Sequence, residues 1–162
     1  MSQVWFTSDL HFGHKNIGTF RDRVNDSEGN TALIRDDWER CVSKRDTVWM
    51  LGDIAFDDEG FRDVRLLPGT KNLVLGNHDT YPIRMYAAAF NKVKGLARYK
   101  NSWLSHSPIH PEELRGKKNL HGHVHRGTLD DERYFNCCVD NLWKVVDRSL
   151  ISLDELRKLG VL

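Results

Sequence analysis

The chain has few cysteines, and their arrangement excludes one common kind of metal site. Only 3 of its 162 residues are cysteine, namely Cys41, Cys137 and Cys138. No Cys-x-x-Cys pair occurs, so the sequence predicts no structural zinc site built from thiolates. An odd number of thiols, with two of them adjacent and unable to pair without strain, is typical of a reducing compartment. We therefore expect a cytoplasmic protein.

The sequence also lacks a strong net charge and long apolar runs. A formal net charge of +1 provides no global basic field, so strong nucleic-acid binding is not predicted. Basic residues gather locally at 92–100 and 115–118, and we interpret these stretches as solvated surface. No apolar run approaches the length that crosses a membrane, and a strand-like run already begins at Val4. We therefore expect neither a leader sequence nor an association with a membrane.

The first half of the chain alternates strand-like and helix-like patterns. Buried strands are predicted at 4–7, 47–51 and 72–75. Helices are predicted at 31–43 and 61–67. Pro82 can begin another helix, whose apolar face would carry Ile83, Tyr86, Ala87 and Phe90. This alternation of strands and helices favours an α/β fold.

The second half is expected to contain more strands and fewer helices. Short strands are predicted at 103–106, 119–121 and 134–139. Near the end of the chain, Ser152 and Glu155 form a capping-box pattern before an apolar helical repeat, and Gly160 marks the end of that helix. Because repeats and linkers are absent, residues 1–162 are predicted to form a single domain.

Five short polar motifs suggest a site for metal ions. They read Asp9-Leu10-His11, Gly52-Asp53, Gly76-Asn77-His78-Asp79, His106 and Gly122-His123-Val124-His125. Carboxylate, amide carbonyl and imidazole together suit manganese, which we favour, and also iron, zinc or nickel. Two such ions polarise a phosphoryl oxygen and generate hydroxide from a bridging water at neutral pH. The motifs therefore predict a site with two divalent metal ions that hydrolyses phosphoesters.

This series of motifs resembles that of the calcineurin-like metallophosphoesterase superfamily. The resemblance extends from Asp9 to His125. The opening run from Asp9 to His14, followed by Asn16, also resembles small members that are common in bacteria and bacteriophages. The resemblance implies an α/β protein whose mixed sheets form a four-layer αββα sandwich.

The resemblance also implies a role for each motif. One metal ion would be bound by Asp9, His11 and His125. The other would be bound by Asn77, His106 and His123, and Asp53 would bridge both ions. His78 would contact the phosphate and either protonate the leaving oxygen or stabilise developing charge. The nucleophile would be the hydroxide that bridges the two metal ions.

Other polar residues near the motifs are candidates for supporting roles or for contact with the substrate. His14 and Asn16 are candidates for contact with the substrate, although His14 could instead support a ligand or face solvent. His110 and His121 lie outside the metal positions of the superfamily pattern. Asp79 either orients His78 or caps the helix near Pro82.

The residues after Gly52-Asp53 bear on the substrate. Protein phosphatases of the superfamily have an Asp-Arg-Gly sequence there, whereas this chain reads Ile54-Ala55-Phe56-Asp57-Asp58. We therefore predict a phosphodiesterase whose substrate is a small phosphoester, with a nucleotide as one candidate. A phosphomonoesterase and a non-catalytic scaffold remain alternatives. Loops at 12–30, 55–62 and 107–118 are candidates for substrate selection, and the sequence does not determine the oligomeric state.

Overall fold

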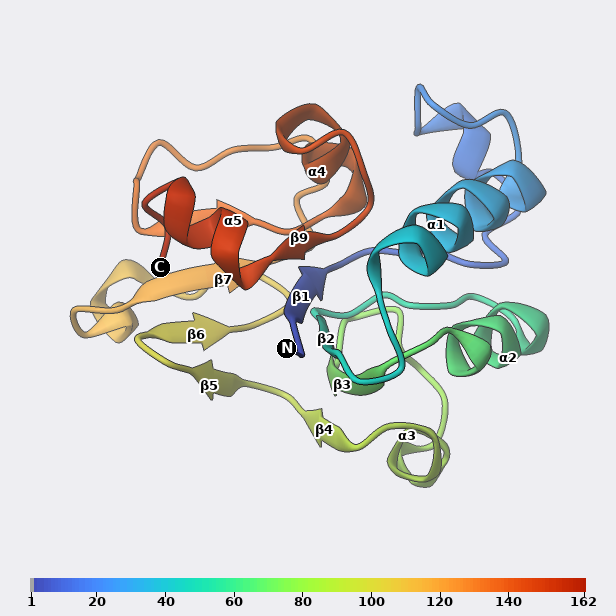
Figure 1. Cartoon of the computed structure of the whole chain (residues 1–162), viewed down its shortest axis with the longest axis horizontal. Coiled ribbons are helices and arrows are strands. Elements are labelled where there is room, and N and C mark those ends of the chain that lie inside the picture. The colour runs from blue at the N-terminus through green and yellow to red at the C-terminus, as the bar shows by residue number, and fades with distance from the viewer. Residues whose placement is uncertain (1) are drawn as a thin grey trace.

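Five strands form the first of two β-sheets in the computed structural model, which describes residues 2–162 (Figure 1). The strand order is β4-β3-β2-β1-β9. The first four strands in the chain are parallel, and β9 runs antiparallel to β1. Their bounds are β1 Val4–Thr7, β2 Thr47–Met50, β3 Thr70–Val74, β4 Lys92–Lys94 and β9 Ile151–Ser152.

The second sheet is mixed and has the strand order β5-β6-β7-β8. Strand β5 is antiparallel to β6, whereas β7 is parallel to both of its neighbours. The bounds are β5 Ala97–Tyr99, β6 Ser102–Leu104, β7 Lys118–His121 and β8 Tyr134–Asn136. The last strand of the first parallel run thus leads directly into the second sheet.

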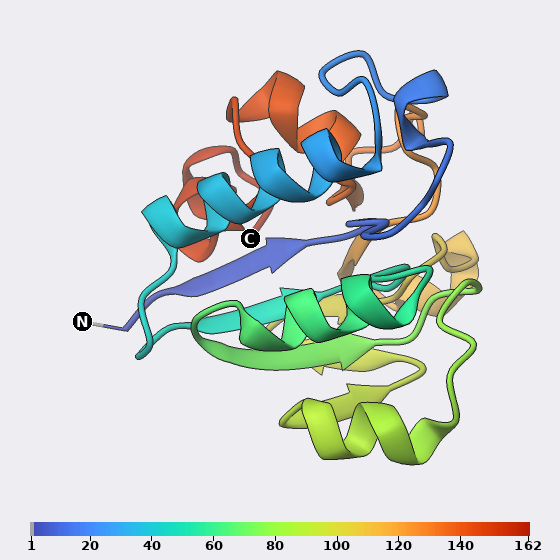
Figure 2. The ribbon, with the colours of Figure 1, turned by 90° about the vertical axis from the view of Figure 1, so that its right-hand side faces the viewer.

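The first four helices connect strands and pack against the outer face of the first sheet, whereas the last helix follows the last strand and packs in the cluster between the sheets (Figure 2). Their bounds are α1 Ser27–Cys41, α2 Asp58–Leu66, α3 Ile83–Ala89, α4 Val139–Val145 and α5 Leu153–Lys158. Two short 3-10 helices are η1 Ile17–Thr19 and η2 Pro111–Leu114. Within residues 2–162, none of the helices has the length and apolar character needed to cross a membrane.

Two hydrophobic clusters hold these layers together. In the outer cluster, Met50 and Leu73 of the first sheet pack with Trp38 of α1. In the inner cluster, Leu51 packs with Leu120 of the second sheet. Successive strand residues point to opposite faces, so each central strand of the first sheet supplies both clusters. The predicted α/β sandwich with mixed sheets is confirmed.

The first two helices begin earlier than the apolar pattern indicated. Helix α1 begins at Ser27 because the Asp26 side chain accepts a hydrogen bond of 2.7 Å from the backbone N–H of Gly29. Asp57 caps α2 in the same way, through a 2.7 Å bond from the backbone N–H of Gly60. Such caps satisfy free N–H groups of the first turn. The apolar periodicity alone missed these polar first turns.

Some predictions for the later elements were wrong. Strand β8 ends at Asn136, and Val139 begins α4 instead of ending a strand. In α3, Tyr86 is buried as predicted, but Ile83 and Ala87 are exposed because this helix contacts the core along a narrow stripe. The capping box of α5 is confirmed, since Ser152 accepts from the Glu155 N–H and Glu155 accepts in return.

Candidate metal centre

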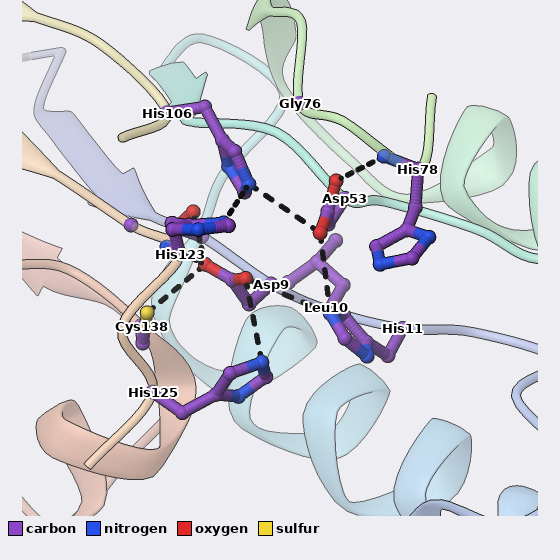
Figure 3. A network of polar contacts seen from close by, with 12 residues as sticks. Asp9, Leu10, His11, Asp53, Gly76, His78, His106, His123, His125 and Cys138 are labelled. Carbon is purple, nitrogen blue, oxygen red and sulfur yellow. Dashed lines mark hydrogen bonds and ion pairs between the residues drawn. The ribbon is translucent and has the colours of Figure 1, made fainter. Parts of the chain in front are cut away.

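The predicted ligands follow the carboxyl ends of strands from both sheets, and Figure 3 shows those other than Asn77 gathered in one place. Asp9 follows β1, Asp53 follows β2 and Asn77 follows β3. These three strands are adjacent and parallel, so their carboxyl ends meet at one edge of the sheet. Strands β6 and β7 of the second sheet bring His106 and His123 to the same place.

Asp9, His11 and His125 form one group of candidate metal ligands, which we call the first donor group. Their ligand atoms all lie within 4.8 Å of one another. Asp9 Oδ1 is 3.6 Å from His11 Nε2 and 3.8 Å from His125 Nε2. Asp9 Oδ1 and His11 Nε2 are buried, yet neither has a hydrogen-bond partner among the described residues. Buried polar atoms normally have partners, so this unpaired set fits a bound cation.

A second group consists of Asn77, His106 and His123. Asn77 Oδ1 is 2.8 Å from His106 Nε2 and 3.0 Å from His123 Nδ1. His106 Nδ1 is 2.8 Å from the carbonyl oxygen of Leu51, and a proton on this nitrogen would make that contact a hydrogen bond. His106 Nε2 then faces Asn77 Oδ1 as a second acceptor. A cation between these two acceptor atoms could bind both of them, so this pair also fits a metal site.

Asp53 lies between these two groups. Its Oδ2 is 3.4 Å from His106 Nε2 and 3.7 Å from His11 Nε2. Its Oδ1 accepts a 2.9 Å hydrogen bond from the backbone N–H of His78. The ligand atoms of Asp9, Asp53 and His106 also lie within 4.8 Å of one another. The Asp53 carboxylate is therefore positioned to reach an ion in either group.

Both carboxylates of the cluster are held in their charged form. Burial raises the pKa of Asp53, but the nearby His106 and His11 side chains stabilise the carboxylate more strongly and hold this pKa far below its ordinary value. Burial likewise raises the pKa of Asp9, but the nearby His11 and His106 side chains bring this pKa well below the usual range. Two divalent cations would exceed this negative charge and leave a positive surplus for an anionic substrate.

The backbone at the cluster has an unusual conformation. Left-handed φ angles occur at five of the predicted ligands, namely Asp9 (58°), His11 (53°), Asp53 (54°), His123 (71°) and His125 (50°). Each such residue other than glycine or asparagine costs on the order of 1–3 kcal/mol. Hydrogen bonds between the loops hold this conformation, including one of 3.0 Å from the Asp9 N–H to the Gly52 carbonyl. Concentrated backbone strain of this kind is typical of functional sites.

Several residues that support the cluster were missed by the motif analysis. Asp9 Oδ2 lies 2.6 Å from Ser8 Oγ and 3.0 Å from the His123 backbone nitrogen. Cys138 Sγ is 3.0 Å from the same oxygen, and burial raises the pKa of this thiol so that it stays protonated and donates. These contacts occupy Oδ2 and leave Oδ1 free to face His11 and His125. No pattern in the sequence connects Cys138 with Asp9.

A buried charged pair supports His125 from behind. Asp140 Oδ2 is 3.1 Å from His125 Nδ1 and 3.1 Å from Arg21 Nη2. The Arg21 side chain is fully buried and also donates to the carbonyl oxygens of Asp9 and Leu10. A carboxylate on the far ring nitrogen fixes the orientation and tautomer of a ligand histidine. Asp140 and Arg21 therefore connect the first ligand loop with His125.

The residues predicted to touch substrate lie around the cluster. His78 is exposed at its edge, beside Asp53 and His11 (Figure 3). His14 is half-buried, and its ring stacks on His11 with centroids 5.7 Å apart. Asn16 is exposed at the start of η1. The substrate roles of these three residues stay predictions.

Asp79 has neither of the two roles predicted for it. Its carboxylate accepts hydrogen bonds from the backbone N–H groups of Gly76 (2.7 Å), Asp53 (2.9 Å) and Ile54 (3.1 Å). The N-cap of α3 is Pro82, and none of the described side chains caps it. Asp79 therefore joins the ligand loop that follows β3 to the ligand loop that follows β2. These two loops are neighbours because β2 and β3 are paired in parallel.

The histidines predicted to lie outside the metal positions have structural contacts. His110 Nδ1 accepts from the backbone N–H of Glu112 and caps η2. His121 is buried, with Nδ1 located 2.9 Å from the carbonyl oxygen of Gly122. Neither belongs to the two donor groups described above.

Close packing at Gly122 gives a testable prediction. A Cβ atom at this position would overlap Ser8 Oγ and lie 2.5 Å from Asp9 Oδ2. We expect Gly122→Ala to lower the free energy of unfolding by about 1–3 kcal/mol and to weaken manganese binding. Thermal unfolding and calorimetric titration with manganese would measure the two effects.

Gly95→Ala is the matched control. A Cβ atom at Gly95 would meet no atom of the described chain within 4 Å. This variant should stay within about 0.5 kcal/mol of the parent and bind manganese normally. Equal stability and equal metal affinity in the two variants would show that the close approach at Gly122 is not required.

Comparison with known proteins agrees with this geometry. The sequence model described as calcineurin-like phosphoesterase matches residues 2–156. The Gene 66 protein of Mycobacterium phage L5 is 35% identical over 77% of this chain and 78% of its own length. The Gene 66 protein of Mycobacterium phage D29 is 33% identical over 98% of this chain and 96% of its own length.

A solved structure shares the fold. It is a protein of unknown function from Aquifex aeolicus, which matches with a TM-score of 0.77 and 27% sequence identity. The match covers 98% of this chain and 100% of that chain. Members of the matched family normally bind two divalent metal ions, and this chain has the corresponding clusters of aspartate and histidine. Because the family model spans nearly the whole sequence, the chain belongs to the calcineurin-like phosphoesterase family.

Proposed function

We propose that the protein is a phosphodiesterase that requires two divalent metal ions and acts on a nucleotide or another small phosphodiester. The observation that carries this proposal is the position of Asp53 between two groups of candidate metal ligands, the first of which contains buried atoms without a hydrogen-bond partner among the described residues. Two divalent ions, for which manganese is our first candidate, would supply a polarised phosphoryl oxygen and a water of lowered pKa. The small bacteriophage relatives are consistent with a compact enzyme of this type.

The chain's own residues would hold the metals in two sets. Asp9, His11 and His125 form the first set, and Asn77, His106 and His123 form the second, with Asp53 shared between them. Ser8, Cys138 and the His123 N–H fix one oxygen of Asp9. Asp140 orients the His125 ring through Nδ1. These contacts preorganise the ligands before metal binding, which lowers the cost of assembling the site.

His78 is the proposed acid for the leaving group. Its backbone N–H donates to Asp53 Oδ1, which ties the residue to the shared ligand. Its ring is exposed and lies 6.3 Å from the His11 ring, measured between centroids. From this position the imidazole N–H can donate a hydrogen bond to the phosphate and transfer a proton to the departing oxygen.

The distribution of basic side chains favours a diester over a monoester. Two clefts adjoin the cluster, one beside His11 and His78 and one beside Asn77 and His106. Among the described residues that line them, Arg126 is the only arginine or lysine. Its guanidinium already bonds to the Phe20 carbonyl and to Asp22. A monoester dianion would require further positive charge, whereas a singly charged diester would not.

Parallel assays would test the proposal. Hydrolysis of bis(p-nitrophenyl) phosphate and of p-nitrophenyl phosphate is measured with manganese, after removal of manganese by a chelator, and after its return. We expect chelation to abolish hydrolysis of the diester, manganese to restore it, and the diester to have the higher kcat/KM. A higher kcat/KM for the monoester would instead identify a phosphomonoesterase.

The same experiment addresses a non-catalytic scaffold. A scaffold would bind metal without hydrolysing either ester or natural nucleotide esters. The retention of His78 and of both donor groups in a convergent arrangement argues against that alternative.

A further inference from the structure

An aromatic cleft opens directly beside the proposed metal cluster. Its volume is about 530 Å³, and its walls include His11, His14, Phe20, Phe56, His78 and Arg126. Two of these residues, His11 and His78, belong to the proposed catalytic centre. A group bound in the cleft would therefore lie next to a phosphate held at the metals.

Phe56 forms the inner wall of this cleft. The bridge between Phe12 and Ala55 holds the loop, and the Phe56 N–H donates a 2.8 Å bond to the Phe12 carbonyl. The Phe56 ring centroid is 4.6 Å from that of His14 and 4.9 Å from that of His78. Although it touches these rings, Phe56 remains 36% exposed. One side of its ring contacts the catalytic centre, and part of it is open to a ligand.

Phe20 forms the outer wall and is 62% exposed. It follows η1, and its ring centroid is 5.9 Å from that of His14. The Phe20 carbonyl accepts a hydrogen bond from Arg126, whose side chain is 42% exposed at the rim. Neither Phe20 nor Phe56 belongs to the two hydrophobic clusters that the described residues form. Packing of the core therefore does not account for either ring.

We propose that this cleft binds a nucleobase of the substrate, stacked on Phe20 and Phe56 while the phosphate lies at the metal cluster. This inference rests on the proposed function and names its substrate class. A flat heteroaromatic ring can stack on exposed phenyl rings, and its polar edge can meet the guanidinium of Arg126 or the ring of His14. An alkyl group would make no polar contact with either side chain, so the wall fits a base better than a lipid chain.

The position of the two rings explains how the cleft could set selectivity. Phe20 lies in segment 12–30 and Phe56 lies in segment 55–62, and both segments were predicted to select substrate; the structure shows that each ends within the first residues of a helix. Segment 12–30 directly follows His11, and segment 55–62 begins shortly after Asp53. Neither segment contains a strand of the two sheets. Changes in the two rings should therefore alter substrate preference without altering the strands that carry the metal ligands.

Two diesters with one leaving group would test the stacking. We expect p-nitrophenyl thymidine 5′-phosphate to have a kcat/KM about 10-fold to 100-fold above that of ethyl p-nitrophenyl phosphate. Phe20→Ala and Phe56→Ala should each lower this ratio at least about 5-fold, while Phe56→Trp should retain it. Leu66→Ala, which removes an apolar side chain 75% exposed on α2, should leave both rates unchanged.

Failure of the stacking proposal would look different from failure of the proposed function. A ratio near 1 in the parent protein, or an unchanged ratio in both alanine variants, would overturn the stacking proposal. Equal losses on the two esters would also overturn it, because the rings would then only shape the catalytic centre. If metal-loaded protein hydrolyses neither ester, the proposed function fails while the stacking proposal is still decided by binding.

Saturation-transfer NMR with adenosine 5′-monophosphate provides that binding measurement. We expect transfer from the protein to the base protons in the parent, with a clear reduction in Phe20→Ala, whose exposed side chain is dispensable for packing. Leu66→Ala should retain the transfer. Absence of transfer in the parent, or equal transfer in the parent and Phe20→Ala, would overturn the proposal.

Discussion

His123→Ala is expected to lose a metal ion together with nearly all activity, whereas His78→Ala should lose activity with both ions bound. His123 Nδ1 converges with Asn77 and His106 on one point, so its removal takes a ligand from the second group. His78 belongs to neither donor group and approaches the cluster from the substrate side. Loss of a general acid lowers kcat by about 10²-fold to 10⁴-fold.

The two histidine variants should differ most clearly in metal content. Metal analysis after dialysis against limiting manganese should find two ions in His78→Ala and fewer in His123→Ala. We expect manganese affinity in His123→Ala to fall by at least about 10-fold to 100-fold, the effect known for residues that only support a ligand. His110→Ala changes an exposed histidine of η2 and is the matched control. Equal metal loss at positions 78 and 123 would contradict the roles proposed for them.

Arg21→Met is expected to have the largest effect on stability. Arg21 is fully buried, pairs with Asp140, and donates to two carbonyl oxygens of the first ligand loop. Removing it leaves Asp140 as a buried carboxylate without its cationic partner, which costs about 3–5 kcal/mol. Because Asp140 also orients His125, we expect weaker metal binding as well. Denaturant unfolding and metal titration would measure the two effects.

Arg23→Met is a close control for that variant. Arg23 pairs with Asp147, but both side chains are largely exposed, at 44% and 83%. Exposed pairs contribute about 0–1 kcal/mol, so this variant should unfold nearly as the parent does. Similar destabilisation in Arg21→Met and Arg23→Met would show that the buried pair has no special role.

The sequence was informative about the ligand positions because parallel strands place their ends together. Asp9, Asp53 and Asn77 each follow a short apolar strand, and adjacent parallel strands bring such residues to one edge. The donor types also indicated the kind of metal, since carboxylate and imidazole suit first-row divalent ions.

The sequence was less informative about where elements begin and end. The apolar repeat placed the first helix too late, because Asp26 starts it with a polar turn. The run from Tyr134 to Val139 resembled one strand, yet the chain changes to helix at Val139. In both places the boundary depends on hydrogen bonds of the backbone and of a few side chains, which apolar periodicity does not report.

The sequence by itself determined the family resemblance, the α/β class and the set of candidate metal ligands, because these depend on residue types in order along strands. Only the tertiary structure decided what supports and surrounds the donors. Cys138 contacts Asp9 and Asp140 contacts His125 through packing between distant segments. Phe20 and Phe56 likewise line one cleft because distant segments of the chain pack together. Contacts of this kind follow from the way the two sheets and their loops pack in space, which no local pattern along the chain encodes.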